Sequence, residues 1–219
     1  MLVDYLSSMQ AKTFSKMSGI ELADIQIPGK CPHPFEYGGR LIQGQTESSI
    51  VDTSLWTGSR NLDQLPDFIS KITPALRIRL AQRPKASGAP TLIYISGAAL
   101  RVADVTRILK DKKLRGEKGG EVAKLFARHI KLEEHVSYLR RTKLSAAAGT
   151  PGRLGKLLEC DALLTSALSH IIVDVSYRDA KKRNVLDIPE TRDEIFKTVI
   201  GAPKVLQGIR AGRIQLVLL

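Results

Sequence analysis

Hydrophobic residues follow two alternating patterns along most of this chain. Continuous apolar runs, typical of buried strands, occur at residues 91–95, 122–127, 144–148, 170–175 and 214–219. Between these runs, apolar residues recur at helical spacing: Leu100, Val105, Ile108 and Leu109; then Leu132, Val136 and Leu139; then Leu154, Leu157 and Leu158; and finally Ile195, Phe196 and Val199. The alternation predicts a series of strand–helix units.

Repeated strand–helix units predict an α/β fold with a mostly parallel central sheet, because a helix is the usual way to return the chain between parallel strands. Helices then cover both faces of the sheet, in a doubly wound arrangement. A chain of 219 residues is long enough for one substantial core with extra segments. Turn-forming residues predict loops at 28–49 and 111–120, and the sequence has no internal repeat.

The chain is strongly basic, with 34 Lys and Arg against 22 Asp and Glu and a net charge of +12. Residues 101–143 alone carry 13 basic and 6 acidic residues. Such an excess indicates an anionic partner, either nucleic acid or an acidic membrane face, although exposed helix faces have the same composition. A path for RNA along this stretch is one interpretation.

Cysteine and histidine are too sparse to predict a metal site. Cys31 and His33 form a weak pair, Cys160 stands alone, and the other histidines are scattered, so we expect neither a metal nor a disulfide framework. The sequence has no apolar run of membrane-spanning length and no signal-peptide core. We therefore expect a soluble, intracellular protein without a membrane partner.

The stretch GTPGRL at residues 149–154 predicts a helix start that can hold a phosphate. Thr150 suits the capping position, Pro151 the first helical position, and Gly152 permits close approach of another backbone. Free backbone N–H groups and the neighbouring Arg153 make such a helix start a candidate phosphate site.

The order of elements around this stretch is similar to the first RecA-like domain of DEAD-box RNA helicases. In that domain a TPGR loop contacts the RNA backbone, so the resemblance implies an RNA contact at Thr150, Pro151, Gly152 and Arg153. The loop after strand 91–95, usually like PTREL, has Ala98 in place of its RNA-facing arginine, and the nearby Arg101 could compensate in part.

The nucleotide-binding residues implied by this resemblance are replaced. TGSRNL at 57–62 resembles the phosphate-binding loop TGSGKT, with Arg60 for glycine, Asn61 for the phosphate-binding lysine and Leu62 for the magnesium-binding threonine. The alternative is that TGSRNL is an ordinary Gly-Ser turn. Under either reading, the sequence contains no intact GxxxxGK[ST] motif.

The acidic box of the helicases is similarly eroded in VDVSYRD. Asp174 stands at the first acidic position, whereas Val175 replaces the glutamate that positions the attacking water and Tyr177 replaces the last aspartate. The chain also ends at IQLVLL, about where the first domain of a helicase finishes, so we expect no second domain to complete an ATP site. The resemblance thus implies a protein that is not an enzyme and has no cofactor.

Several longer stretches resemble the CMS family of small-subunit ribosome biogenesis factors, which are components of the 90S pre-ribosome or small-subunit processome. These stretches are 5–28, 89–109, 124–139, 149–159 and 174–199. The combination of GTPGR with RDAKKRNVLDIPE carries most of the specificity. We expect residues 1–50 to form an N-terminal helical segment and loop, with a flexible insertion at 31–48, and residues 51–219 to form a degenerate RecA-like domain.

The resemblance implies a non-catalytic, nucleolar protein that binds pre-rRNA or a small nucleolar ribonucleoprotein together with assembly factors. Two alternatives remain open: a protein-interaction module without RNA contact, and half of an ATPase completed by a partner. Residues 177–190 are a candidate second contact surface. They could equally be a charged loop entering a helix, with Asp187, Pro189 and Glu190 marking its start.

Overall fold

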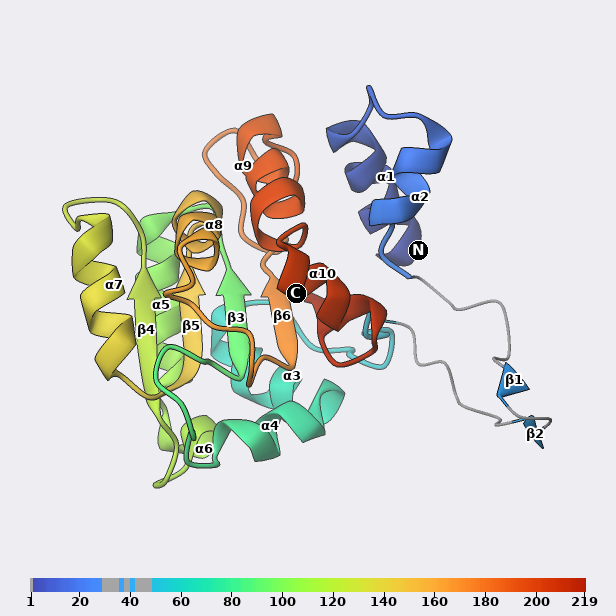
Figure 1. The fold of residues 1–219 in the computed structure, drawn as a ribbon. Coiled ribbons are helices and arrows are strands. Elements are labelled where there is room, and N and C mark those ends of the chain that lie inside the picture. Colours follow the sequence, from blue (N-terminus) through green and yellow to red (C-terminus); the bar gives the residue numbers. More distant parts are fainter. Residues whose placement is uncertain (1, 29–35, 38–39, 42–48) are drawn as a thin grey trace.

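Five parallel strands form the centre of the protein (Figure 1). The structure, a computed structural model, describes residues 2–28, 36–37, 40–41 and 49–219. The strand order across the sheet is β4 (Glu121–Leu125), β5 (Leu144–Gly149), β3 (Leu92–Ile95), β6 (His170–Val173) and β7 (Gln215–Leu218). Every pairing in this sheet is parallel. The predicted strands are confirmed, because runs buried on both faces are recognisable as continuous apolar stretches.

The segment before TGSRNL continues the sheet beyond β7. Ile50 forms an isolated parallel bridge with Leu216, whose N–H donates to the carbonyl of Ser49 at 2.7 Å. The N–H of Val51 in turn donates to the carbonyl of Leu216 at 2.8 Å. Residues 57–62 therefore begin at the carboxyl edge of the sheet, where the chain leaves this pairing.

Each face of the sheet carries its own hydrophobic core, as a doubly wound fold requires. Within β3, Ile93 and Ile95 belong to one core, whereas Leu92 and Tyr94 belong to the other. The first core is completed by α1 (Leu2–Thr13), α7 (Leu132–Arg141), α8 (Pro151–Glu159), the π-helix η2 (Glu194–Val199) and α10 (Pro203–Arg210). The second is completed by η1 (Leu62–Gln64), α3 (Leu65–Ile72), α4 (Pro74–Leu80), α5 (Ala99–Leu109) and α6 (Lys112–Arg115).

The N-terminal helix packs against the sheet domain through two buried hydrophobic residues. Leu6 and Met9 of α1 lie within the first core, and Arg192 donates to the Thr13 hydroxyl at 3.2 Å. The short helix α2 (Gly19–Ile25) follows and has a capping box in which Ser18 and Glu21 bond each other's backbone. None of the described helices is long and apolar enough to cross a membrane.

The loop predicted at 111–120 is partly wrong, because residues 112–115 form the helix α6. Asp111 caps it by accepting from the N–H of Lys113, and Leu114 is buried in the second core. Most of the loop predicted at 28–49, including Cys31, His33 and most of the insertion at 31–48, lies outside the described residues. Its described parts, β1 (Glu36–Tyr37) and β2 (Arg40–Leu41), pair antiparallel.

The predicted helix around Ile195 is also present, but with an unusual geometry. Helix α9 (Pro189–Asp193) begins where Asp187, Pro189 and Glu190 predict, and it continues directly into η2. In this last turn the N–H of Ile200 donates to the carbonyl of Ile195, a π-helical bond, at 2.8 Å. Ile195, Phe196 and Val199 are buried, as their spacing predicts.

Two glycines allow α8 and η2 to pack closely. A Cβ on Gly155 would overlap the side chain of Thr198, and a Cβ on Gly152 would overlap the carboxylate of Glu194. The Thr198 hydroxyl is itself held by the carbonyl of Glu194 at 2.6 Å. The helix that starts at Pro151 is thus fixed against the C-terminal part of the chain.

We predict that Gly155→Ala lowers the free energy of unfolding by about 1–3 kcal/mol, because the added methyl group has no space beside Thr198. Alanine in a helix interior would otherwise stabilise by about 1 kcal/mol, so the sign of the change is informative. Urea denaturation provides the measurement. Gly19→Ala is the matched control, because nothing lies within 4 Å of its Cβ position. Equal stability of Gly155→Ala and the unmodified chain would contradict the packing.

Candidate degenerate nucleotide site and phosphate loop

Arg60, at the first replaced position of TGSRNL, ties this segment to the last strand. Its guanidinium donates to the carbonyl of Leu218 at 2.9 Å and to the buried Thr53 hydroxyl at 2.8 Å. It also lies 5.8 Å from the ring centroid of Phe68 in α3. The side chain at this position therefore joins three elements of the fold: the segment after the Ile50 bridge, β7 and α3.

The next two positions also serve the fold. The Asn61 side chain accepts from the N–H of Gln64 at 3.2 Å and caps the helical turn η1. Leu62 is buried in the second core. A capping amide and a core leucine supply neither the charge that binds a phosphate nor the hydroxyl that holds magnesium in an intact loop of this kind.

Asp174, which resembles the first residue of the helicase acidic box, is buried and paired with Arg101. Only 1% of its surface is exposed, and it accepts from Arg101 Nε at 2.8 Å. The Ser176 hydroxyl and the Tyr177 N–H donate to its other oxygen at 2.7 and 3.1 Å. Burial alone disfavours the charge of Arg101, but the bond and charge of Asp174 outweigh it and raise the pKa of Arg101.

Tyrosine rings lie close to this ion pair. The Arg101 guanidinium lies 5.5 Å from the ring centroid of Tyr177, which replaces the last aspartate of the acidic box. Val175 is half-buried against the first core. Burial, followed by the negative charge of Asp174, raises the pKa of Tyr94. In the described part of the chain, no group of three or more His, Cys, Asp and Glu is placed to hold a metal.

Arg153 of the Thr150 loop is directed into the protein. It is 8% exposed, and its guanidinium donates to the carbonyls of Ile130 at 2.8 Å and Lys131 at 3.0 Å. The same guanidinium lies 2.8 Å from Nδ1 of His135. Burial, followed by the charge of Arg153, lowers the pKa of His135, so the ring is neutral and can accept this bond. Arg153 thus fixes the start of α7 to α8.

The other three residues of the loop lie at the carboxyl edge of β5. Thr150 is half-buried and its N–H donates to the carbonyl of Leu125 at 3.0 Å. The predicted side-chain cap is absent: the Thr150 hydroxyl makes no hydrogen bond to the first turn of α8. Pro151 starts α8 as predicted and is buried, whereas Gly152 is half-buried beside Glu194.

The five RNA-binding candidates are therefore divided between two places. The residues from Thr150 to Arg153 lie at the start of α8. Arg101 instead pairs with Asp174, which directly follows β6. Both guanidiniums already have protein partners. Sequence reasoning could not find these roles, because the partners of Arg153 are main-chain carbonyls about twenty residues away.

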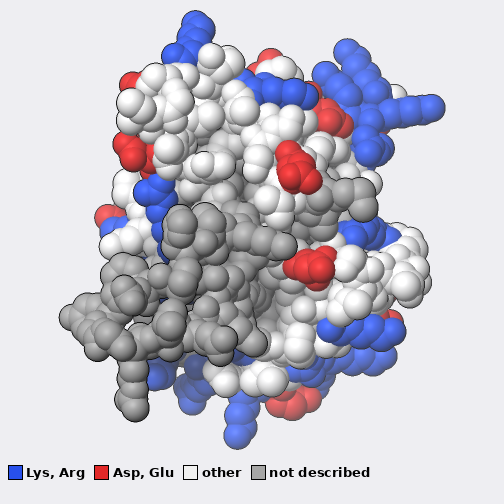
Figure 2. All heavy atoms as spheres, turned by 90° about the vertical axis from the view of Figure 1, so that its right-hand side faces the viewer, with Lys and Arg blue, Asp and Glu red and all other residues white. Residues whose placement is uncertain are grey.

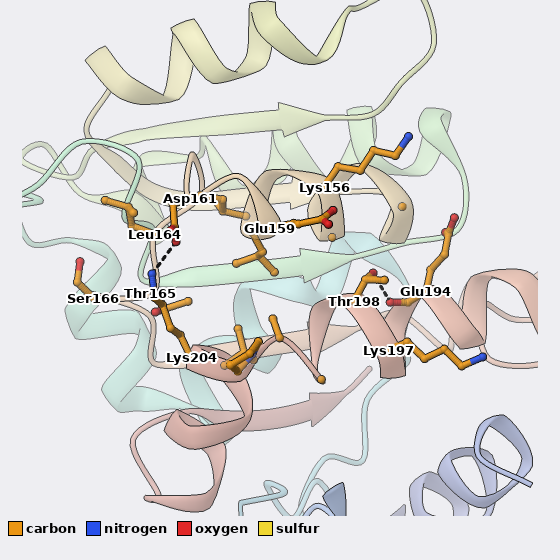
Figure 3. Close-up of a pocket in the computed structure, with 18 residues that line it drawn as sticks. Lys156, Glu159, Asp161, Leu164, Thr165, Ser166, Glu194, Lys197, Thr198 and Lys204 are labelled. Carbon is orange, nitrogen blue, oxygen red and sulfur yellow. Dashed lines mark hydrogen bonds and ion pairs between the residues drawn. The ribbon is translucent and has the colours of Figure 1, made fainter. Parts of the chain in front are cut away.

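A pocket of about 760 Å³ opens beside α8 (Figure 3). Lys156 and Glu159 of α8 lie on one side of it, and Glu194, Lys197 and Thr198 of η2 lie on the other. The pocket is lined by three lysines and three acidic residues, and one of these lysines, Lys204, pairs with Asp161 at 2.6 Å. Apolar residues from the end of α8, the loop after it and the start of α10 line much of the rest, namely Leu158, Leu163, Leu164, Ala202, Pro203 and Val205. The sequence carries no signal for this pocket, because its walls come from distant segments.

The fold and the site define a parallel α/β domain in which Arg60, Asn61 and Leu62, in a segment that resembles a phosphate-binding loop, make internal contacts. The chain belongs to the CMS1 family, described as U3-containing 90S pre-ribosomal complex subunit, whose model matches residues 39–219. This description implies a role in ribosome biogenesis. The family resemblance drawn from the sequence is confirmed.

Curated relatives support this assignment. The chain is 35% identical to Protein CMS1 of Chaetomium thermophilum over 92% of its own length and 72% of the relative. It is 31% identical to Protein CMSS1 of Danio rerio over 81% of its length and 58% of the relative. It is 28% identical to Protein cms1 of Schizosaccharomyces pombe, of which it spans 61%. The chain thus matches about three-fifths to three-quarters of these proteins.

Solved DEAD-box structures are similar at low sequence identity. A DEAD-box protein of Methanococcus jannaschii is 14% identical, with a TM-score of 0.42 over 73% of this chain and 37% of its own. The yeast DEAD-box splicing factor Prp28 is 14% identical, with a TM-score of 0.46 over 74% of this chain and 34% of its own.

We predict that Arg153→Ala lowers the free energy of unfolding by about 2–4 kcal/mol, because two buried carbonyls and His135 lose their donor. Arg153→Lys should not restore stability, since a single ammonium cannot reproduce the forked geometry. Thermal and urea unfolding measure both changes. The control is Lys156→Ala on the same helix, which is exposed and should change stability by less than about 0.5 kcal/mol. A neutral Arg153→Ala would show that this side chain does not hold the fold together.

Proposed function

We propose that this chain is a non-catalytic, RNA-binding subunit of the small-subunit processome. It acts in the nucleolus, where it contacts pre-rRNA and neighbouring assembly factors during small-subunit rRNA processing. Family membership and the net charge of +12 support this proposal. Its homologues carry names of the CMS1 and CMSS1 type rather than names of enzymes.

The observation that carries the proposal is the use of Arg60, Asn61 and Leu62 within the fold. Arg60 bonds the end of β7, Asn61 caps η1 and Leu62 lies in the core. An ATPase would need a lysine on the β- and γ-phosphates and a hydroxyl on the metal at these positions. Losing such contacts removes several kcal/mol of transition-state stabilisation, which favours a binding role over turnover.

The proposed RNA contact at the Thr150 loop rests chiefly on Thr150 and Gly152. Arg153 and Arg101 are occupied by Lys131 and Asp174 respectively, so they position the loop and the neighbouring strand end instead of reaching outwards. A helix start can still present backbone N–H groups to a phosphate. This contact accounts for one binding point and leaves most of the positive charge of the chain unassigned.

A protein-interaction role is the second candidate, favoured by the pocket between α8 and η2. Its apolar lining and balanced rim charges suit a protein surface better than a phosphate backbone. An assembly factor bound there would lie beside the Thr150 loop. Gly152 belongs to the loop and also lines the pocket, so the two contacts adjoin at the start of α8.

We predict that the purified chain shows no saturable binding of magnesium-ATP up to about 1 mM, the upper end of the range typical of enzyme substrates. Isothermal titration and a phosphate-release assay provide the measurement, with an intact DEAD-box helicase domain as the positive control. Micromolar affinity together with turnover would refute the non-catalytic assignment, whereas micromolar affinity without turnover would favour half of an ATPase completed by a partner.

A further inference from the structure

Positive charge gathers at the amino-terminal edge of the sheet, opposite to the Thr150 loop. Residues 77–85, 110–118 and 140–143 precede β3, β4 and β5, and together they contain twelve Lys or Arg and two acidic residues. We name the Lys and Arg side chains of these three segments the basic face. Because parallel strands begin at the same edge, all three segments meet at one end of the molecule, at the lower edge of Figure 1.

Backbone contacts hold the three segments of the basic face together. The N–H of Gly88, just after the first segment, donates to the carbonyl of Thr142 at 2.9 Å. The N–H of Glu121, just after the second, donates to the carbonyl of Lys143 at 2.9 Å. The hydroxyl of Ser145 also donates to the carbonyl of Leu80 at 3.1 Å. The charges therefore sit on one rigid surface, although the segments are far apart in sequence.

Most of these charges are open to solvent and uncompensated. Arg83, Lys85, Lys113 and Lys143 are exposed, and none of the four forms an ion pair with a described carboxylate. The ion pairs of the basic face within the described residues are Lys112 with Glu117 and Arg115 with Glu121. Figure 2, turned about the vertical axis from Figure 1, shows Lys and Arg side chains along the same lower border.

The opposite edge of the sheet has no comparable excess. The segments that follow β4 and β6, residues 126–134 and 176–194, contain seven basic and seven acidic residues between them. Several of these charges neutralise each other: Arg183 pairs with Asp179 at 2.8 Å and Arg178 with Asp187 at 3.5 Å. The strongest attraction for a polyanion is therefore at the amino edge, away from the degenerate nucleotide site.

We propose that the basic face binds the sugar-phosphate backbone of an RNA helix. The proposal rests on the RNA-binding role proposed above and assigns it to a different surface. Residues 77–85, 110–118 and 140–143 contain no aromatic side chain on which unpaired bases could stack. Double-stranded RNA is recognised mainly by shape and by contacts to phosphates and 2′-hydroxyls. A rigid, basic surface without a stacking platform fits a stem rather than a single strand.

The test is binding of a fluorescent RNA hairpin with a stem of about 16 base pairs, a length that double-stranded RNA domains span. The variant combines Arg83→Gln, Lys113→Gln and Lys143→Gln, one exposed residue from each segment. The matched control combines Lys12→Gln, Lys16→Gln and Lys124→Gln, which removes the same charge from exposed positions away from the amino edge of the sheet. Unfolding curves of both proteins check that the fold is retained.

We expect the basic-face variant to bind the hairpin at least about tenfold more weakly, and the slope of log affinity against log salt to fall by about 2 to 3. The control should keep nearly full affinity, and a single strand of equal length should bind more weakly than the hairpin. Equal weakening of both variants would overturn the assignment, as would a preference for the single strand. Effective competition by polyglutamate would indicate an acidic protein partner and also overturn it.

Two further outcomes separate this inference from the proposed function. If the unmodified chain binds RNA and the basic-face variant binds it equally well, the basic face is wrong while the RNA-binding role stands. If the unmodified chain binds no RNA, both proposals fail.

Discussion

A buried carboxylate at the end of the central strand β6 must be matched by a positive charge. Asp174 is almost fully enclosed, and a buried charge without a partner costs several kcal/mol. Arg101 meets it at 2.8 Å, while Ser176 and the Tyr177 N–H occupy its other oxygen. The chain thus supplies its own cation at the residue that resembles the first aspartate of a helicase acidic box. The Asp174 carboxylate is therefore occupied by contacts within the protein.

Two further arginines, Arg60 and Arg153, also bond acceptors within the protein. Arg60 bonds the end of β7 and the Thr53 hydroxyl, and Arg153 bonds the carbonyls that precede α7. Each of these guanidiniums joins segments that are distant in sequence. Arginines in this region therefore act as internal connectors. The densest group of exposed Lys and Arg side chains lies at the amino edge of the sheet, away from these connecting arginines.

The sequence predicted the sheet well because its strands are buried on both faces and appear as continuous apolar runs. The helix starts at Pro151 and Pro189 were also predictable, since proline at the first helical position is a local signal. Helix α6 was missed because it has only 4 residues with a single apolar position, and its stability depends on the Asp111 cap and on burial of Leu114. Local composition does not contain that tertiary contact.

The candidate site was predictable in position but not in the roles of its side chains. The replacements at Arg60, Asn61 and Leu62 are visible in the sequence, whereas their new contacts depend on Leu218 and the second core. The phosphate-loop resemblance placed Arg153 at a helix start. It could not reveal that the side chain turns towards Ile130. The direction of a long side chain depends on partners that only the folded chain brings together.

The central claim is that Arg60, Asn61 and Leu62, in the segment that resembles a phosphate-binding loop, stabilise the fold. Its most direct test is the free energy of unfolding of a chain carrying Arg60→Gly, Asn61→Lys and Leu62→Thr, measured by urea denaturation with and without magnesium-ATP. The account predicts a loss of about 3 kcal/mol or more, because a core leucine, a cap and an arginine link disappear together, and no recovery when nucleotide is added. A variant as stable as the unmodified chain, or one stabilised by magnesium-ATP, would contradict it.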